Sequence, residues 1–293
     1  MKQLTLAVCL FIASLHTVQA GQRVFYQPLD SDASLSTQQW QHIWQASAKQ
    51  GIDTVIVQWT AYGDAAFGGA QGWLANSLRE ARAQGLHLVL GLYMDPAYYQ
   101  RIQELDSAGL AEYWRVQLGR SLAQQQHLRD EWKLPAAGWY MPMELDDLHF
   151  QANERRQELQ RQLKDLSAKL DAPLHISAFS AGKLAPTVYG SWLGWLATDG
   201  LHVWAQDGAG TGRLPAVVRQ AYLGALPCKV GVVHEAFRQT SAAGQPFTAE
   251  PASTAAASTG CHPGAVFALR YLPQGQPLLD NQRSARANNV QDH

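Results

Sequence analysis

The sequence has little of three things: long apolar runs, net charge and cysteine. The apolar run at residues 4–15 is too short to cross a bilayer, and no later stretch is apolar enough to do so, which excludes a membrane span. The net charge of −1 provides no field that would attract nucleic acid or an anionic membrane. We therefore expect a globular chain with no nucleic-acid partner and no membrane span.

The first residues match a secretory signal peptide rather than part of a fold. Lys2 supplies a short positive start, the apolar run follows, and residues 18–20 (Val-Gln-Ala) place small side chains where a signal peptidase cleaves. Position 21 is glycine, so the cysteine that a lipoprotein needs at the cleavage point is absent. The sequence predicts a signal peptide over residues 1–20 and a free, soluble protein that is periplasmic or secreted.

Of the three cysteines, Cys9 lies inside that signal peptide, which leaves Cys228 and Cys261. An even pair in an exported chain favours a disulfide, and two separate small buried residues are the alternative. Motifs for bound groups are also missing. There is no HExxH or paired histidine spacing, no dinucleotide fingerprint after the first strand, and no P-loop lysine in the glycine-rich loop at 208–212. We expect no metal and no cofactor.

Apolar strands alternate with amphipathic helices along the rest of the chain. Strands are predicted at residues 23–28, 53–59, 86–93, 136–142, 173–178, 201–205, 228–234 and 265–271. A capping box of Ser36 and Gln39 opens the first helix, and leucines at 159, 163, 166 and 170 mark a later one. Eight such units in about 250 residues predict an α/β fold, a single-domain (β/α)8 TIM barrel over residues 21–273. A doubly wound open sheet is the main rival.

Two segments carry weaker patterns. Residues 240–260 are rich in Ala, Ser and Thr, and form either a loop tethered by the disulfide or a poor final helix. Residues 274–293 form a polar C-terminal tail that we expect to be frayed or disordered.

Two glutamates stand where barrel enzymes place reactive groups, at the ends of strands. Glu144 ends the fourth predicted strand and Glu235 ends the seventh. Glycoside hydrolysis needs one protonated and one ionised carboxyl on either side of the scissile bond. The apolar and aromatic residues at 140–143 favour a protonated Glu144, which makes it the acid and Glu235 the nucleophile. The alternative is that each glutamate is an ordinary polar residue at a strand end.

Other side chains at the predicted strand ends suit a sugar. Aromatic rings, with Trp59 and Trp204 the strongest candidates among the chain's 10 tryptophans, offer flat apolar faces, and amides and carboxylates bind hydroxyls. The substrate-binding candidates are Gln27, Gln58, Trp59, Tyr93, Trp204, Gln206, Asp207 and Tyr271.

The segments VFYQP, GIDTVIVQW, GWYMPMEL and VWAQDGAG resemble a bacterial family of glycoside-hydrolase-like barrels of unassigned function. The positions of Glu144 and Glu235 are also similar to those of the 4/7 superfamily of retaining glycosidases. That resemblance implies an acid/base at Glu144 and a nucleophile at Glu235. One position departs from it: Met143 stands where the superfamily has an asparagine that binds the sugar 2-hydroxyl.

The sequence thus predicts an exported retaining glycoside hydrolase that acts on a polysaccharide or oligosaccharide. A catalytically inactive carbohydrate-binding barrel is the second hypothesis. A serine hydrolase is the third, because Ser180, Asp207 and His234 follow one another in the chain order of α/β-hydrolases, although the first glycine of the nucleophile elbow is missing.

Overall fold

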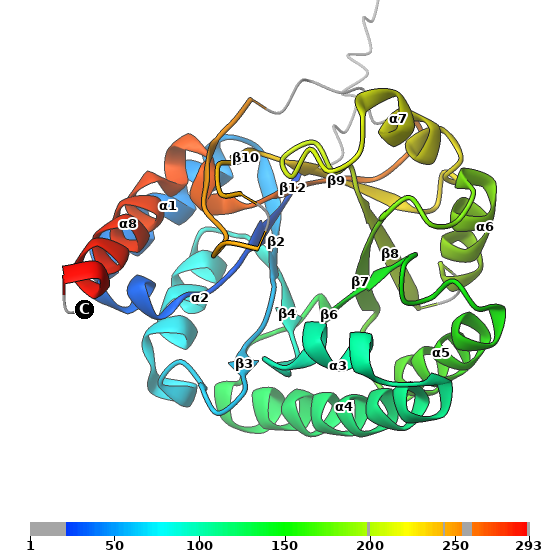
Figure 1. The fold of residues 1–293 in the computed structure, drawn as a ribbon. Helices are drawn as coiled ribbons and strands as arrows, with labels where there is room; N and C mark the ends of the chain where they lie inside the picture. Colours follow the sequence, from blue (N-terminus) through cyan, green and yellow to red (C-terminus); the bar gives the residue numbers. More distant parts are fainter. Residues whose placement is uncertain (1–21, 198–199, 243, 254–259, 292–293) are drawn as a thin grey trace, which may run out of the picture.

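Eight parallel strands close into a barrel in the computed structural model, which describes residues 22–197, 200–242, 244–253 and 260–291 (Figure 1). This confirms the predicted fold class. Around the barrel the strands follow the order β1-β12-β9-β8-β7-β6-β4-β2. Their bounds are β1 Gln22–Tyr26, β2 Ile52–Val57, β4 His87–Gly91, β6 Gly138–Asp146, β7 Leu174–Phe179, β8 Leu201–Gln206, β9 Gly231–Glu235 and β12 Gly264–Phe267.

Helices surround this barrel (Figure 1). They are α1 Thr37–Lys49, α2 Trp73–Ala83, α3 Tyr98–Glu104, α4 Ser107–His127, α5 Asn153–Ser167, α6 Pro186–Leu196, α7 Ala216–Gly224 and α8 Gln276–Gln291. The predicted capping box is confirmed at α1, where Ser36 accepts from the Gln39 amide and Gln39 accepts from the Ser36 amide. A single π-helical turn, Leu128–Trp132, continues α4 at its C-terminal end.

The strands divide their side chains between two cores, as a period of two requires. Alternate residues join the large core between strands and helices, while the residues between them form a small cluster inside the barrel. Seven strands contribute one buried residue each to the inner cluster: Phe25, Ile56, Val89, Tyr140, Trp204, Val233 and Ala265. The barrel is therefore a packed core, and chemistry is confined to its ends.

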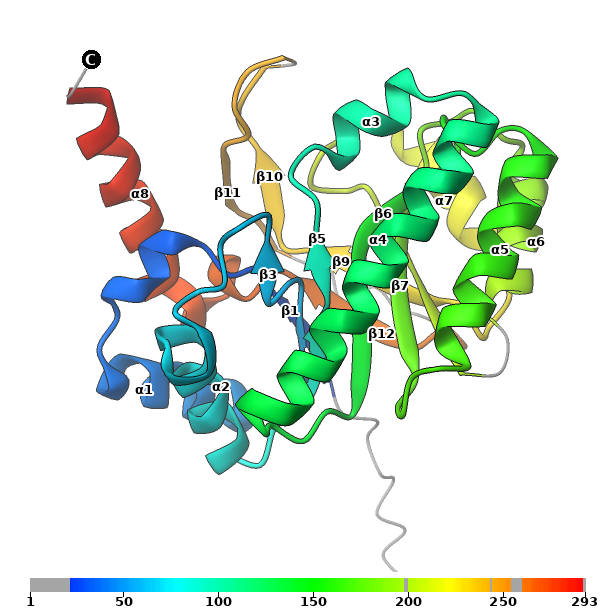
Figure 2. The ribbon, with the colours of Figure 1, turned by 90° about the horizontal axis from the view of Figure 1, so that it is seen from below.

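Short additional elements gather at the end of the barrel where the strands terminate (Figure 2). There, β3 Ala61–Tyr62 pairs with β5 Tyr93–Met94, and β10 Phe237–Gln239 pairs antiparallel with β11 Ala249–Pro251. Helix α3 lies at the same end (Figure 2). Loops at this end of a barrel carry the functional groups in enzymes of this fold.

Two sequence predictions are corrected near the C-terminus. The predicted strand at 265–271 ends at Phe267, and the 3-10 helix Leu269–Tyr271 follows it, so Tyr271 does not stand at a strand end. The polar segment expected to be frayed forms α8, because Leu278 and Leu279 are buried and the helix packs against the 3-10 helices Asp30–Ser34 and Leu269–Tyr271. The described part of residues 240–260 runs from the end of β10 through the hairpin turn into β11, and it contains no helix.

The predicted disulfide is confirmed: Cys228 and Cys261 are bonded, with Cα atoms 5.2 Å apart. It ties the segment before β9 to the segment before β12. The predicted signal peptide, with Cys9, lies outside the described residues. In the part of the chain that the structure describes, no helix has both the length and the apolar character needed to cross a membrane.

Candidate functional site

A polar layer lies directly above the apolar cluster inside the barrel. Gln58, Gln206 and Glu235 each follow an inner-cluster residue by two positions, so the period of the strands turns them to the same side. Gln58 is buried, and its amide oxygen has no hydrogen-bond partner among the described residues. Gln27 stands two positions beyond Phe25, and its carbonyl oxygen accepts a hydrogen bond from Arg270 at 2.7 Å.

Glu144 joins this layer through an irregularity in β6. From Met141 to Leu145 the chain advances four positions, while the paired strand β7 advances two, from Ile176 to Ala178. Met141, Met143 and Leu145 belong to the outer core, so Glu144 is turned to the inside like Tyr140.

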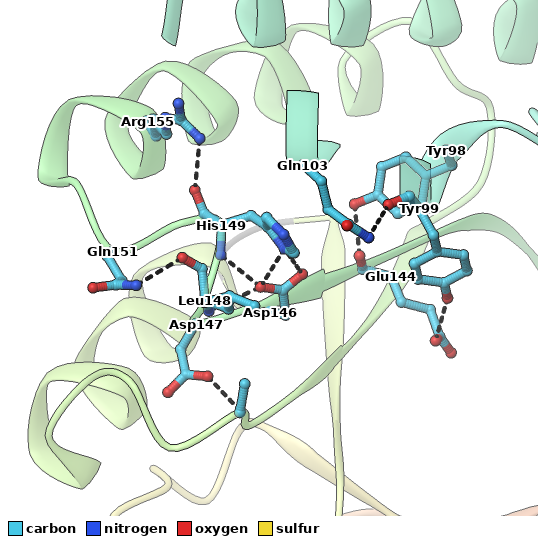
Figure 3. Close-up of polar contacts among 11 residues, drawn as sticks. Tyr98, Tyr99, Gln103, Glu144, Asp146, Asp147, Leu148, His149, Gln151 and Arg155 are labelled. Atoms are coloured by element: carbon cyan, nitrogen blue, oxygen red, sulfur yellow. Dashed lines mark hydrogen bonds and ion pairs between the residues drawn. The ribbon is translucent and has the colours of Figure 1, made fainter. Parts of the chain in front are cut away.

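The Glu144 carboxyl is surrounded by hydrogen-bond donors rather than by the apolar side chains that precede it in sequence. Oε1 accepts from Gln206 Nε2 at 2.7 Å and from the Ser177 hydroxyl at 3.3 Å. Oε2 accepts from the Tyr99 hydroxyl at 2.8 Å, as Figure 3 shows. Burial raises the pKa of Glu144, while these three hydrogen bonds lower it. The donors thus offset part of the cost of keeping a buried carboxylate charged.

Glu235, only 5% exposed, has different surroundings. Its Oε2 accepts from two backbone amides of the loop after β8, Gly210 N at 2.6 Å and Thr211 N at 3.1 Å. Burial, followed by the negative charge of Asp207, raises the pKa of Glu235 to about 7 against those two hydrogen bonds. Near neutral pH this carboxyl can therefore hold or release a proton.

The two glutamates share one end of the barrel and influence each other. The charge of Glu144 contributes to the raised pKa of Glu235, so the two carboxyls are within electrostatic reach. Strand β8 lies between β9 and β7, and its last residue, Gln206, binds Glu144. The next residue, Asp207, accepts from the backbone amide of Glu235 at 3.3 Å, so one short segment contacts both glutamates.

The remaining predicted binding residues are placed differently. Trp204 is 3% exposed and points towards the amino ends of the strands, where its ring stacks on His175 and Arg23 lies 5.7 Å from the ring centre. Trp59 is buried and donates to the carbonyl oxygen of Pro28 at 3.2 Å. The structure does not bring Trp204 to the mouth of the barrel.

Tyr93 and Tyr271 also face neighbouring elements. The Tyr93 hydroxyl lies 3.1 Å from Arg120 Nη1 on α4, and Arg120 covers its ring. Tyr271 is buried, with its ring centre 5.4 Å from that of Phe237.

The two acidic residues after Glu144, Asp146 and Asp147, accept hydrogen bonds from backbone amides of neighbouring loops (Figure 3). Asp146 accepts from the amides of Leu148 and His149, and Asp147 accepts from the amides of Ala181, Lys183 and Leu184.

The groups of the proposed serine triad are only partly together. His234 Nδ1 lies 3.1 Å from Asp207 Oδ2, but His234 Nε2 is buried with no hydrogen-bond partner among the described residues. A serine nucleophile would occupy that nitrogen. Ser180 therefore does not contact His234, and the third hypothesis has no assembled site.

Sequence reasoning missed Tyr99, Ser177 and the amides of Gly210 and Thr211. A donor to Glu144 or Glu235 leaves no local pattern when it lies 24 to 45 residues away along the chain. One signal was available for Tyr99: it follows the predicted third strand closely, in the loop where barrels carry site residues.

Comparisons with known proteins place this chain in a family. The chain is 34% identical over 282 residues to "Uncharacterized protein YbcH" of Escherichia coli (strain K12), covering 89% of this chain and 93% of that protein. A solved structure from Bacteroides thetaiotaomicron VPI-5482, provisionally assigned as an alpha-L-fucosidase, superposes with a TM-score of 0.60 at 16% identity, covering 97% of this chain and 98% of that one. The family described as "Domain of unknown function (DUF4434)" matches residues 22–258. The chain belongs to this DUF4434 family.

Proposed function

We propose that the protein is a glycoside hydrolase that uses Glu144 and Glu235 as its two catalytic carboxyls. The observation that carries this proposal is the placement of both side chains inside the carboxyl end of one closed barrel, at the ends of β6 and β9, the fourth and seventh barrel strands along the chain. Electrostatic coupling between the two carboxyls supports it. The fold shared with the alpha-L-fucosidase-like structure is consistent with this chemistry.

The surroundings of each carboxyl indicate which one is the proton donor and which one is the nucleophile. Burial raises the pKa of both carboxyls, but their neighbours differ: three neutral donors contact Glu144 and favour its anion, whereas the negative charge of Asp207 favours the protonated form of Glu235, whose pKa is about 7. We therefore assign the proton donor to Glu235 and the anionic carboxylate to Glu144, the reverse of the assignment that the superfamily resemblance implies. Glu235 protonates the leaving oxygen as the glycosidic C–O bond breaks, and Glu144 bonds to the anomeric carbon. Glu235 then takes a proton from water, whose oxygen displaces Glu144, so the configuration is retained.

The substrate is proposed to be a polysaccharide or an oligosaccharide. The amides of Gln58 and Gln206 lie in the same polar layer as the two carboxyls and suit sugar hydroxyls. Partly exposed aromatic rings occur on three elements at this end: Tyr62 on β3, Tyr99 on α3 and Phe247 in the β10–β11 hairpin. Flat apolar rings of this kind pack against the C–H faces of sugars.

Export to the periplasm or the medium is part of the proposal. The Cys228–Cys261 disulfide supports it, because such bonds persist in oxidising compartments and are rare in the cytosol.

Hydrolysis of a panel of 4-nitrophenyl glycosides and of polysaccharides tests the proposal. We expect Glu144→Gln and Glu235→Gln each to lower kcat at least a thousandfold on whichever substrate is cleaved, because removing a catalytic carboxyl costs several kcal/mol. Glu112→Gln, on the exposed face of α4, is the matched control. Sugar binding without cleavage by the wild type would overturn the proposal in favour of a binding protein.

The roles are tested separately with azide as an external nucleophile. In the Glu144→Ala variant azide replaces the missing carboxylate and gives a glycosyl azide of inverted configuration. In the Glu235→Ala variant it attacks the glycosyl-enzyme and gives the retained configuration. The opposite pattern would restore the assignment implied by the superfamily.

A further inference from the structure

Helix α3 donates two hydrogen bonds to Glu144. Its consecutive residues Tyr98 and Tyr99 both donate to this one glutamate: Tyr98 to the main-chain oxygen at 2.7 Å, and Tyr99 to the side-chain Oε2 at 2.8 Å (Figure 3). The first bond fixes where the residue lies, and the second fixes the direction of its carboxyl.

The start of α3 is itself held in place. Asp95 Oδ1 accepts from the amide of Ala97, and Asp95 Oδ2 accepts from the Tyr113 hydroxyl at 2.8 Å and from Gln117 at 3.2 Å. Tyr113 and Gln117 belong to α4, so α3 is tied to the helical layer. The phenol of Tyr99 therefore reaches Glu144 from a fixed base.

The two tyrosines differ in exposure although their ring centres are only 5.1 Å apart. Tyr98 is fully buried and accounts for the packing of α3 on the barrel, whereas Tyr99 is 41% exposed. A ring needed only for packing would be buried like its neighbour. The exposed ring next to a candidate catalytic carboxyl points to a role towards the substrate.

The two oxygens of the Glu144 carboxyl have different hydrogen-bond donors. Gln206 and Ser177 both bind Oε1, while Tyr99 is the donor to Oε2 among the described residues. Ser177 is also bonded to the Tyr140 hydroxyl at 2.7 Å, so it is shared. The titratable groups that face Glu144 are Tyr98 and Tyr99 on α3, Tyr140 and Asp146 on β6, and Glu235 on β9.

We propose that Tyr99 is a positioning residue, whose phenol orients the Glu144 carboxylate and stabilises its negative charge while the exposed face of its ring contacts the sugar. The inference rests on the proposed function for its catalytic meaning, but the hydrogen bond to Glu144 can be tested without a substrate. The same residue then links substrate binding to the ionisation of Glu144.

The test is a pH titration of the side-chain carboxyl carbons of Glu144 and Glu235 by NMR, in the full chain labelled with ¹³C-glutamate. In Tyr99→Phe we expect the apparent pKa of Glu144 to rise by about one unit, since a hydrogen bond to the charged form is lost. Tyr62→Phe, a rim tyrosine that is 37% exposed, is the matched control and should leave the titration unchanged. Identical Glu144 titrations in wild type and Tyr99→Phe would overturn the proposal.

Kinetics on a glycoside that the wild type cleaves distinguish the role of the Tyr99 hydroxyl from the role of its ring. Tyr99→Phe should lower kcat and shift the acidic limb of the pH profile upward with little change in KM, whereas Tyr99→Ala should also raise KM. A merely structural tyrosine would lower the thermal midpoint in both variants without moving the pH profile. If no glycoside is cleaved but the titration shifts, the proposed function fails and the role of Tyr99 towards Glu144 stands.

Discussion

The backbone amide of Gly210 donates to Oε2 of Glu235 at 2.6 Å, and a side chain at position 210 has no room. A Cβ there would lie 2.6 Å from the carbonyl oxygen of Phe237 and 2.9 Å from Glu235 Oε2. The close approach of the loop to the Glu235 carboxyl therefore explains the glycine at this position.

Gly210→Ala tests this contact. The loop must retreat, which removes two donors from Glu235, so we expect a loss of stability of about 1–3 kcal/mol and a tenfold or larger loss of hydrolysis. Chemical denaturation and kcat provide the measurements. Gly224→Ala, at the end of α7 with open space around it, is the control and should be neutral. A Gly210→Ala variant with normal activity would show that the loop does not support Glu235.

Glu235 makes stability depend on pH in an unusual direction. Its pKa is about 7 in the folded protein and 4.5 ordinarily, so between these values the folded state binds more protons than the unfolded state. Stability falls as pH rises through this window, by about 3 kcal/mol in total. Glu235→Gln should remove this loss and be more stable than wild type at pH 8, as measured by urea unfolding at pH 4.5 and 8. Parallel curves for the two proteins would contradict the assignment.

His175 acts in the opposite direction at the other end of the barrel. Burial, with the neighbouring charges of His202 and Arg23, lowers its pKa from 6.5 to about 3, and its Nδ1 accepts from Trp204 Nε1 at 3.1 Å. The unfolded state binds more protons between pH 6.5 and 3, so this residue makes stability fall as the pH drops, by about 5 kcal/mol at most.

We expect His175→Asn to be less stable than wild type at pH 7 but to lose less stability on acidification to pH 4, in urea unfolding at both values. His87→Asn, on the exposed start of β4, is the control. Equal losses in wild type and His175→Asn would exclude a buried neutral histidine.

The disulfide closes a loop with a sequence separation of 33. Replacing both Cys228 and Cys261 by serine should lower the free energy of unfolding by about 3–4 kcal/mol, because the unfolded chain regains the entropy of that loop. The bond joins segments that precede β9 and β12, away from the carboxyl ends, so kcat at 25 °C should be unchanged. A variant with unchanged thermal midpoint but impaired kcat would reverse this interpretation.

The barrel was predictable because its strands and helices carry their signals locally. The β-branched run of β2 and the capping box at Ser36 were read directly, and Glu144 and Glu235 followed from strand order. The sequence did not predict how deep inside the barrel each inward-facing side chain lies. Trp204 and Gln206 lie two residues apart on one face of β8, yet one closes the interior and the other binds Glu144.

Long-range contacts explain the remaining errors. The segment after Phe267 is as apolar as a strand, but Tyr271 packs against Phe237 on the hairpin instead of extending the sheet. The C-terminal helix needs only a few buried side chains, chiefly Leu278 and Leu279, so its polar composition concealed it. In both cases a partner distant in sequence decided the conformation.

The two additional residues in β6 have a consequence for comparing relatives. Because side chains alternate along a strand, an extra pair leaves the inward direction of Glu144 unchanged, whereas a single extra residue would turn it into the helical layer. Natural insertions or deletions between Tyr140 and Glu144 are therefore expected to occur in twos. An alignment that opens a one-residue gap there would assign the glutamate of another family member to the wrong side of the barrel wall.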